Sequence, residues 1–532
     1  MDKEDPQGGA RVFPEPRDIW RAEADPGRGA RGMAQVFAAG GEVGQLMSAM
    51  DWSATPLGPL RGWCTELRMA VSICLESHFP MQVLWGPDLI IIQNDGLAVH
   101  IGEKYPECIG RPYREVFPEA MPSVGPLLSQ VMSGGGATWS QDLPVLLDRH
   151  GYLEEGYFTF SFSPIRRIPT AEVLGVFVAS HETTRHVVGL RRLSCLREIA
   201  GVTVHAQTSG EVFTDAVGAL SHTSADVPYC VILLRDPRTP RLVLRPVATA
   251  GLATVPDVFS RPGTLDPDGL LPEFGDSLIS GRMLISRRLL DRLELQPITD
   301  VPSANRALVV PLTAGGDDPP IGLLVAGISD RLPLDGDYRT FLTLAATQIS
   351  SAASMAHSTA EARYQALHDT LTGLPNRAAL FDHLGQVIVE AQEHAQRLGF
   401  LFVDLDGFKT VNDSLGHQAG DDLLCAVANR IRRAVRPGDF VARLAGDEFA
   451  VLCQNITSTD EIEAVADRVL VAVSTFSSHE PQARTVTASI GIALSGPTTS
   501  TPDELVRAAD VAMYTAKRQG RDRHQLFDGA TL

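Results

Sequence analysis

Blocks of alternating or continuous apolar residues predict three successive α+β regions along this chain of 532 residues. The first forty residues lack such a pattern, because Gly, Pro and charged residues dominate them, and we expect 1–40 to be disordered. The first patterned region should hold an amphipathic helix and a small antiparallel sheet. Its predicted elements are a helix at 60–75 and strands at 81–85, 89–92, 157–163 and 173–179.

A second region begins with a helical connector at about 186–200, where leucine and isoleucine recur every three residues. Beyond it, short apolar runs separated by Pro, Gly and Asp predict a second antiparallel sheet. The predicted strands are 229–234, 242–244, 308–310 and 321–326.

The stretch 337–367 has the composition of a long helix. Leu342, Ile349 and Ala356 lie seven residues apart, with Ala345 and Ala352 between them, which is the spacing of a parallel two-helix seam. The alternative is a helix that packs back onto the preceding sheet. A seam of such small residues would be weak, and a weak seam could serve as a switch.

The third region combines a buried strand with a hairpin, and both carry acids. The run 398–403 is apolar and then gives way to Asp404 and Asp406, which predicts a central strand ending in carboxylates. Downstream, two apolar runs flank Ala445-Gly-Asp-Glu448, which predicts a tight hairpin turn with two adjacent acids. Taken alone, such a turn is better explained as an ordinary solvated turn, because Gly and Asp are the usual residues of hairpin turns. Brought together, however, the acids would repel each other unless a cation lay between them, and hard oxygen ligands of this kind suit Mg²⁺.

Six motifs extend this hypothesis. They are Asp369-Thr-Leu-Thr-Gly-Leu-Pro-Asn-Arg377, Asp404-Leu-Asp-Gly-Phe-Lys-Thr-Val-Asn412-Asp, Gly416-His-Gln-Ala-Gly-Asp421, Ala445-Gly-Asp-Glu-Phe449, Ser489-Ile-Gly491 and Lys517-Arg-Gln-Gly-Arg521. Together, and in this order, they resemble the GGDEF domain of diguanylate cyclases over about the last third of the chain. The resemblance implies that 368–530 folds as a ferredoxin-like, palm-type α/β sandwich, so the whole chain is expected to be a multidomain α+β protein.

Two further resemblances concern the front of the chain. The region 41–186 is similar to PAS sensor domains through Asp51–Gly58, Trp85–Pro87 and Gly151–Ile165. The region 187–355 is similar to GAF domains through Val227–Tyr229, Ala250–Gly251 and Pro311–Leu312. This leaves 356–367 as a signalling helix linker. Domains of both kinds can hold a ligand, but no residue pattern here identifies one.

The GGDEF resemblance implies condensation of two GTP into cyclic di-GMP and two pyrophosphates. It implies that Asp404 and Asp447 bind Mg²⁺ or Mn²⁺ together with the backbone carbonyl of Leu405. Glu448 is then a further metal-binding or proton-accepting carboxylate. Losing any of these acids should remove most of the activity.

For the substrate, the resemblance implies that Asn412 and Asp421 face the guanine edge. A carboxylate accepts from guanine N1–H and the exocyclic amine, whereas adenine lacks this donor pair. Lys517 and Arg521, four apart on a predicted helix, are expected to share a face and to hold the terminal phosphates, with Lys409 nearby. An ordinary solvated basic face is the alternative.

Two more positions bear on activity. The first glycine of the family signature is Ala445 here, which is acceptable in an extended conformation, whereas Gly446 remains where the backbone should approach a phosphate. Arg436-Pro-Gly-Asp439 resembles the RxxD product-inhibition site of the family, which implies that Arg436 holds a phosphate and Asp439 a guanine of bound cyclic di-GMP. A plain turn is the alternative. Because two GTP-loaded halves must face each other, the active form should be at least a homodimer.

Composition narrows the partners. The chain has 46 basic and 64 acidic residues, and this net charge of −18 argues against nucleic-acid binding. Seven singly placed cysteines are typical of a reducing compartment, and no apolar run is long enough to span a bilayer. We therefore expect a cytoplasmic protein without membrane insertion. A catalytically inactive receptor for GTP or cyclic di-GMP is the alternative function, which the retained acids disfavour.

Overall fold

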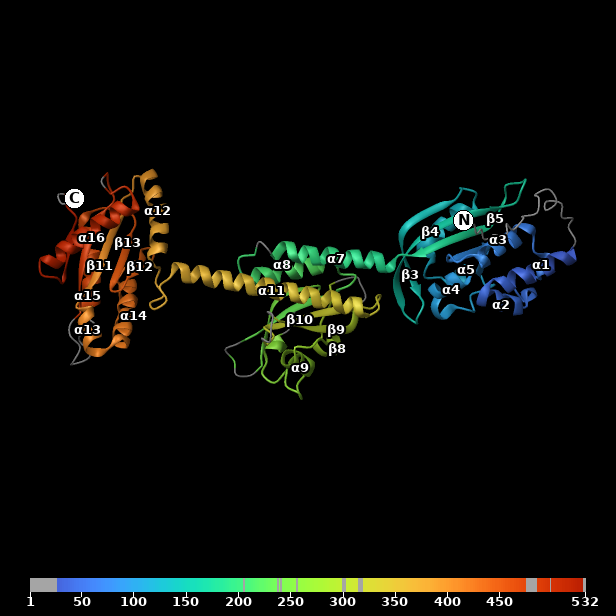
Figure 1. The fold of residues 1–532 in the computed structure, drawn as a ribbon, viewed down its shortest axis with the longest axis horizontal. Coiled ribbons are helices and arrows are strands. Elements are labelled where there is room, and N and C mark those ends of the chain that lie inside the picture. The colour runs from blue at the N-terminus through green and yellow to red at the C-terminus, as the bar shows by residue number, and fades with distance from the viewer. Residues whose placement is uncertain are drawn as a thin grey trace, which may run out of the picture. The chain divides into compact units, whose positions relative to one another are not determined.

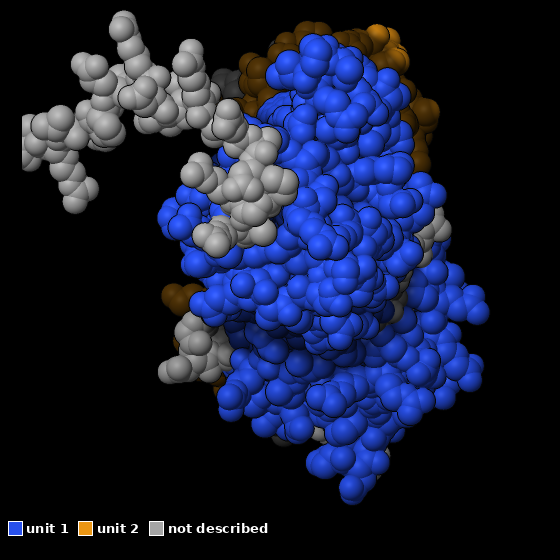
Figure 2. All heavy atoms as spheres, turned by 90° about the vertical axis from the view of Figure 1, so that its right-hand side faces the viewer, with its two compact units in different colours: residues 1–354 blue, residues 355–532 orange. Residues whose placement is uncertain are grey.

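The computed structural model describes residues 26–203, 206–236, 239, 242–254, 257–298, 303–313, 319–474, 486–497 and 499–529 (Figure 1). The chain forms two compact units, Met1–Ser354 and Met355–Leu532, which Figure 2 shows in different colours. In the described part of the chain, no helix has the length and the apolar character that crossing a membrane requires.

The N-terminal part of the first unit is built on a five-stranded antiparallel sheet with the order β2-β1-β5-β4-β3. Its strands are β1 Met81–Trp85, β2 Ile90–Gln93, β3 Thr138–Asp148, β4 Leu153–Arg166 and β5 Val173–Glu182. Its helices are α1 Pro26–Ala39, α2 Gly41–Ala49, α3 Thr65–Glu76, α4 Asp95–Ile101, α5 Tyr113–Val116 and α6 Met121–Met132. All four predicted strands are present, whereas β3 was missed because polar residues and Pro144 interrupt its apolar pattern.

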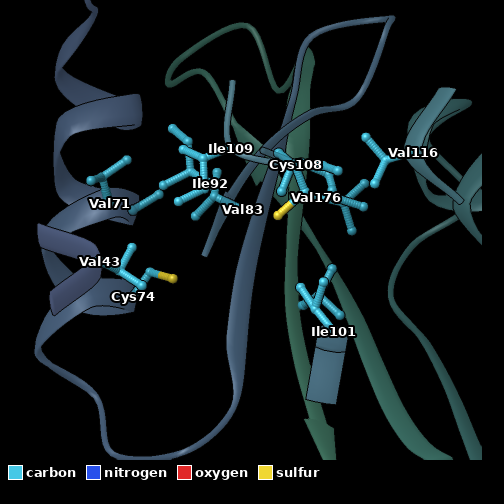
Figure 3. Close-up of a cluster of buried hydrophobic side chains, with 14 of the residues drawn as sticks. Val43, Val71, Cys74, Val83, Ile92, Ile101, Cys108, Ile109, Val116 and Val176 are labelled. Atoms are coloured by element: carbon cyan, nitrogen blue, oxygen red, sulfur yellow. The ribbon is translucent and has the colours of Figure 1, made fainter. Parts of the chain in front are cut away.

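The core of this part lies between the sheet and the helices α2 and α3. Figure 3 shows Val43, Val71 and Cys74 of the two helices beside Val83 and Ile92 of the strands. All five side chains are completely buried. The apolar residues of β1 and β2 therefore serve a packed core, as the pattern predicts.

Helix α1 corrects the predicted disorder of 1–40. Met33 and Phe37 lie one turn apart on α1 and are 2% and 1% exposed in the same core. The ring of Phe37 lies 6.5 Å from that of Trp52 and 6.4 Å from that of Trp63. Two apolar side chains at helical spacing thus fold this segment despite its glycines. Residues 1–25, which the same prediction covered, lie outside the described residues.

The remainder of the first unit holds a second antiparallel sheet with the order β7-β6-β10-β9-β8. Its strands are β6 Cys230–Arg235, β7 Leu244–Ala250, β8 Leu284–Arg287, β9 Ser303–Leu312 and β10 Gly322–Ser329. The helices are α7 Thr184–Thr203, α8 Ser209–Ser221, α9 Pro272–Ser280 and α10 Leu289–Leu293. Helix α7 confirms the predicted connector, whereas β8 was not predicted.

A buried ion-pair cluster lies where α7 meets the second sheet. The Asp226 side chain is fully buried and accepts from Nε of Arg191 at 2.6 Å and Nε of Arg192 at 2.7 Å. Arg191 also binds Glu155 of β4 at 2.7 Å, and the Arg192 guanidinium lies 4.5 Å from the ring centroid of Tyr338. Because the carboxylate has lost all contact with water, both guanidiniums are needed to compensate its charge.

Helix α11 runs from Gly336 to Leu367, as predicted for 337–367. Leu342, Ala345 and Ile349 are 0% exposed within a single chain, so they cannot pair with a second copy. The predicted two-helix seam is therefore wrong at these positions, and the alternative of a helix that packs back onto its own domain is right. A seven-residue apolar spacing serves both arrangements equally well, which is why the sequence did not separate them. Residues 357–366 are exposed on all sides.

The second unit is a sheet with the order β12-β13-β11-β14-β15, in which β15 is parallel to β14 and the other neighbours are antiparallel. Its strands are β11 Gly399–Asp406, β12 Phe440–Ala445, β13 Glu448–Cys453, β14 Thr487–Leu494 and β15 Arg523–Leu526. Its helices are α12 Arg377–Glu393, α13 Phe408–Leu415, α14 His417–Ala434, α15 Thr459–Ser474 and α16 Pro502–Arg518. All eight residues of β11 are buried in the middle of the sheet, which confirms the predicted central strand.

Helices cover both faces of this sheet and make it an α/β sandwich. Leu401 of β11 packs in a core with α14 and α15, whereas Phe402 packs in a second core with α12 and α16. Alternate residues of a strand point to opposite faces, so Asp404 and Asp406 extend the Phe402 side. Both acids are thereby directed toward the helix that carries Lys517.

Candidate active site

The acids predicted from the sequence meet where β11 and β13 run side by side. The two strands pair so that Asp404 lies directly opposite Glu448. The N–H of Leu405 donates to the carbonyl of Asp447 at 3.2 Å, which ties the hairpin turn to the end of β11. Cross-strand neighbours in an antiparallel pair lie about 5 Å apart, so the carboxylates share one small region.

Arg443 holds the turn that carries two of these acids. Its Nε and Nη2 donate to the carbonyl of Gly446 at 3.0 and 2.7 Å, and its Nη1 donates to Oδ1 of Asp369 at 2.8 Å. Gly446 has φ 49°, where glycine is favoured, whereas Ala445 is the last residue of β12. The predicted hairpin and the extended conformation of Ala445 are both confirmed.

The electrostatics of the cluster reflect crowded negative charge. Asp404 is 7% exposed, and its pKa is raised by burial and by the charges of Asp447 and Asp406, against the opposing effect of Lys517. The pKa of Glu448 is raised by burial first and then by the charges of Asp404 and Asp447. A cation placed among these groups would relieve the repulsion.

Two basic side chains reach the same strand end, but from different elements. Nζ of Lys517 on α16 lies 2.7 Å from Oδ2 of Asp404, and Nε of Arg521 lies 3.6 Å from Oδ1 of Asp406. The prediction that Lys517 and Arg521 share a helix face is wrong, because α16 ends at Arg518 and Gly520 follows with φ 120°. Arg521 approaches from the turn beyond the helix.

The donor set fits a hard divalent cation such as Mg²⁺. Carboxylate oxygens are what Mg²⁺ prefers, and the ammonium of Lys517 already lies against Asp404 as a cation would. The raised pKa of Asp404 and Glu448, caused first by burial, marks charge that the protein alone leaves under-compensated. Within the described ranges, no three His, Cys, Asp or Glu side chains are close enough to enclose a metal by themselves.

The residues predicted to read the base lie on α13 and α14. Oδ1 of Asn412 is buried and has no hydrogen-bond partner among the described residues. A Cβ on Gly420 would lie 1.9 Å from this oxygen, so the glycine makes room for the Asn412 side chain. Asp421 follows Gly420 on α14 and is half-buried, whereas Lys409 is exposed.

Comparison with known proteins assigns this part of the chain. Residues 366–523 match the family described as diguanylate cyclase, GGDEF domain. These residues form a GGDEF domain. The diguanylate cyclase TpbB of Pseudomonas aeruginosa is 39% identical over 205 residues, which are 38% of this chain and 46% of TpbB. The bifunctional diguanylate cyclase/cyclic di-GMP phosphodiesterase MucR of the same species is 44% identical over 182 residues, 34% of this chain and 26% of MucR.

This chain thus spans less than half the length of each of these curated relatives. Among solved structures, one of TpbB comprises only the GGDEF domain and is 41% identical to this chain. The match covers 30% of this chain and 94% of the TpbB chain, with a TM-score of 0.28. The family match concerns the C-terminal part of the chain.

The RxxD motif of the GGDEF domain forms a tight turn. The N–H of Arg436 donates to Oδ2 of Asp439 at 3.0 Å, and Gly438 between them has φ 110°. The Arg436 guanidinium is paired with Glu461 of α15. The pKa of Glu461 is lowered to about 2, first by the backbone N–H of Thr457 and then by Arg436. The motif therefore forms the plain turn that the sequence leaves open as the alternative.

Several residues that shape the GGDEF site received no role from the sequence. Arg443, Asp406 and Gly420 lie in or beside the motifs that carry the resemblance, but their partners are distant in sequence or on another helix. Glu461 lies outside every motif and 25 residues from Arg436. Only the strict order of the motifs could have indicated the first three, and nothing in the sequence indicates the fourth.

Proposed function

We propose that this protein is a diguanylate cyclase that condenses two GTP into cyclic di-GMP and two pyrophosphates. The 3′-hydroxyl of each GTP attacks the α-phosphate of the other, forming one P–O bond and breaking the bond to pyrophosphate. The GGDEF match over 366–523 and the 39% identity to TpbB support this activity. The observation that carries it is the pairing of Asp404 with Glu448 beside Asp447 at one strand end.

The acids suit the phosphoryl chemistry. Asp404, Asp447 and the carbonyl of Leu405 would hold Mg²⁺ or Mn²⁺, with Glu448 as a further ligand or proton acceptor. A bound divalent cation would neutralise phosphate charge as the new bond forms. The raised pKa of Glu448, caused first by burial, makes this carboxylate better suited to accept the proton of an attacking hydroxyl.

Basic and amide groups would orient the nucleotide. Lys517, whose Nζ lies 2.7 Å from Asp404, would bind a phosphate oxygen of the nucleotide. Arg521 would bind a second phosphate oxygen. Lys409, which is exposed and close to Asp404 in the sequence, would contribute near the phosphates. The Asp421 carboxylate would accept from guanine N1–H and the exocyclic amine, and the Asn412 carboxamide would bind the same edge of the base. Adenine is excluded because it lacks this pair of donors.

Assembly and control complete the proposal. Two GTP-loaded domains must face each other, so the active form is at least a homodimer. Cyclic di-GMP would lower the rate by binding Arg436 and Asp439 after displacing Glu461. The regions 41–186 and 187–355, each an antiparallel sheet with helices, would act as PAS-like and GAF-like sensors for ligands that their residues do not identify. Seven free cysteines support a reducing, cytoplasmic setting.

The decisive experiment incubates the purified chain with GTP and Mg²⁺ and separates the nucleotides by chromatography with mass detection. Glu448→Gln removes the charge of this acid, whereas Glu393→Gln makes the same change at the exposed last residue of α12. We expect cyclic di-GMP and pyrophosphate from wild type and Glu393→Gln, and little or none from Glu448→Gln. Adding Arg436→Ala should prolong product accumulation.

A wild-type dimer that binds GTP but forms no cyclic di-GMP, even after Arg436→Ala, would overturn the cyclase assignment in favour of a receptor. Equal turnover by Glu448→Gln and wild type would show that Glu448 is not a catalytic group.

A further inference from the structure

Asp406 lies two residues beyond Asp404 on β11, yet its surroundings are different. Both carboxylates extend the same face of the strand and both are nearly buried, at 7% exposure for Asp404 and 8% for Asp406. Asp404 meets one ammonium group, that of Lys517, at 2.7 Å. Asp406 instead has protein donors on both of its oxygens, as a carboxylate with a structural task does.

Four donors converge on Asp406 from two separate elements. Ser489 Oγ donates to Oδ1 at 2.9 Å and Thr487 Oγ1 donates to Oδ2 at 3.0 Å, both from β14. The backbone N–H of Asp522 donates to Oδ2 at 3.3 Å, and Arg521 Nε lies 3.6 Å from Oδ1. The carboxylate thus fastens the turn after α16 to the middle of the sheet.

That turn has a backbone that needs fastening. Gly520, Arg521 and Asp522 follow one another with φ of 120°, 62° and 49°. The N–H of Arg521 donates to the carbonyl of Ala516 at 3.2 Å, which closes the helix end, but a left-handed conformation is unfavourable for Arg and Asp. The hydrogen bonds from the turn to Asp406 offset that cost and fix the backbone position from which the Arg521 side chain extends.

We propose that Asp406 is a positioning residue for nucleotide binding, which acts by holding Arg521 in place to bind a terminal phosphate of GTP. This inference rests on the proposed function, because Arg521 has a phosphate to bind only if GTP enters the site. It assigns the two acids of β11 to separate tasks. Asp404 remains available to a cation, whereas Asp406 is fully engaged by the chain's own donors.

The test compares Asp406→Asn, Arg521→Ala and the double variant in the full chain. An asparagine keeps the shape but removes the charge and turns one acceptor into a donor, which meets the Arg521 guanidinium if it replaces Oδ1 and the Asp522 N–H if it replaces Oδ2. The control Asp382→Asn makes the same chemical change at an exposed position of α12. Ser489→Ala removes one donor from Asp406 and serves as a milder variant if Asp406→Asn does not fold.

Two readouts are needed. One is the dissociation constant of the α,β-methylene analogue of GTP, which cannot be cleaved at the reacting bond, measured by calorimetry. The other is the separation of KM from kcat at saturating Mg²⁺. We expect Asp406→Asn and Arg521→Ala each to weaken analogue binding and raise KM about tenfold, the size of one lost charge-assisted hydrogen bond. The double variant should be no weaker than Arg521→Ala alone, and Asp382→Asn should match wild type.

The alternatives predict different results. A purely structural role for Asp406 lowers the melting temperature and gives additive losses in the double variant, which would overturn the inference. A raised Mg²⁺ requirement for Asp406→Asn, equal to that of Asp404→Asn, would assign Asp406 to the metal instead and would also overturn it. If wild type binds no analogue at all, the proposed function fails and the positioning role fails with it.

Discussion

Replacing Gly420 by alanine is expected to weaken GTP binding without weakening the fold. Gly420 lies in the first turn of α14, and a Cβ there would meet Oδ1 of Asn412 at 1.9 Å. The nearest contact outside Asn412, 3.3 Å to Cζ of Phe408, requires only a slight shift. The substitution therefore acts on one group, the carboxamide that the proposed function assigns to the guanine base.

The size of the effect follows from the geometry. An ordinary contact begins at 3.4 Å, so the Asn412 oxygen must retreat by about 1.5 Å. A hydrogen bond of ordinary length does not survive such a shift, and a neutral one contributes about 0.5–1.5 kcal/mol, or about two- to tenfold in affinity. Alanine also stabilises a helix by about 1 kcal/mol relative to glycine, which opposes any loss of stability.

The assay measures KM for GTP, affinity for the methylene analogue and the melting temperature of Gly420→Ala. Gly385→Ala is the matched control, since Gly385 lies in α12 with nothing within 4 Å of an added Cβ. Asn412→Ala and the double variant complete a cycle. We expect the Gly420→Ala effect to disappear in the Asn412→Ala background, because the oxygen that the methyl group displaces is then absent.

Unchanged GTP affinity in Gly420→Ala would refute the reasoning, since it would show that the Asn412 carboxamide is free to move without consequence. So would an equal loss in the Asn412→Ala background, because the methyl group would then act through some other contact.

Three further predictions concern charge. Burial and neighbouring carboxylates raise the pKa of Glu448, so the folded state holds this proton more tightly than the unfolded chain and ionisation costs stability as pH rises through the folded pKa. Glu448→Gln should therefore raise the melting temperature at pH 7, a gain that disappears below about pH 4; an equal gain at both pH values would exclude this cause. Asp226→Asn leaves the buried Arg192 without its acid and Arg191 with Glu155 alone, and should cost about 3–5 kcal/mol in denaturant unfolding, against no change for the exposed Asp215→Asn. Glu461→Gln releases Arg436 and should tighten cyclic di-GMP binding about twofold to fivefold by calorimetry, and weaker binding would show that Glu461 supports the site.

Much of the GGDEF domain could be predicted because its strands are short and locally determined. The run before Asp404 contains only apolar residues and Gly, which in a sheet is possible only for a central strand covered on both faces. The hairpin is predictable as well, because a glycine stands in the turn between two apolar runs. The φ of Gly446 is 49°, a value that favours glycine. The meeting of the acids, however, came from the family resemblance and not from the pattern.

Errors arose where one pattern serves two structures. The spacing of Leu342 and Ile349 fits a seam between two chains and a helix buried in its own domain, and only the burial of both residues decides for the second. The segment around Phe37 has the composition of a disordered tail, yet two apolar residues suffice to anchor a helix. The spacing of Lys517 and Arg521 predicts that both lie on one helix, whereas α16 ends at Arg518, before the positive φ of Gly520.

The two acids of β11 show that a sequence motif alone does not determine the role of each of its residues. Asp404 and Asp406 have the same side chain, the same strand, the same face and nearly the same exposure. Donors from β14 and from the turn after α16, 81 to 116 residues away, occupy both oxygens of Asp406 and leave Asp404 with a single lysine. A metal can bind a carboxylate whose acceptors are filled only by displacing its donors. A carboxylate that is held by one flexible ammonium group can exchange that group for a metal more easily. The division of labour between the two is therefore set by tertiary contacts, which no local pattern records.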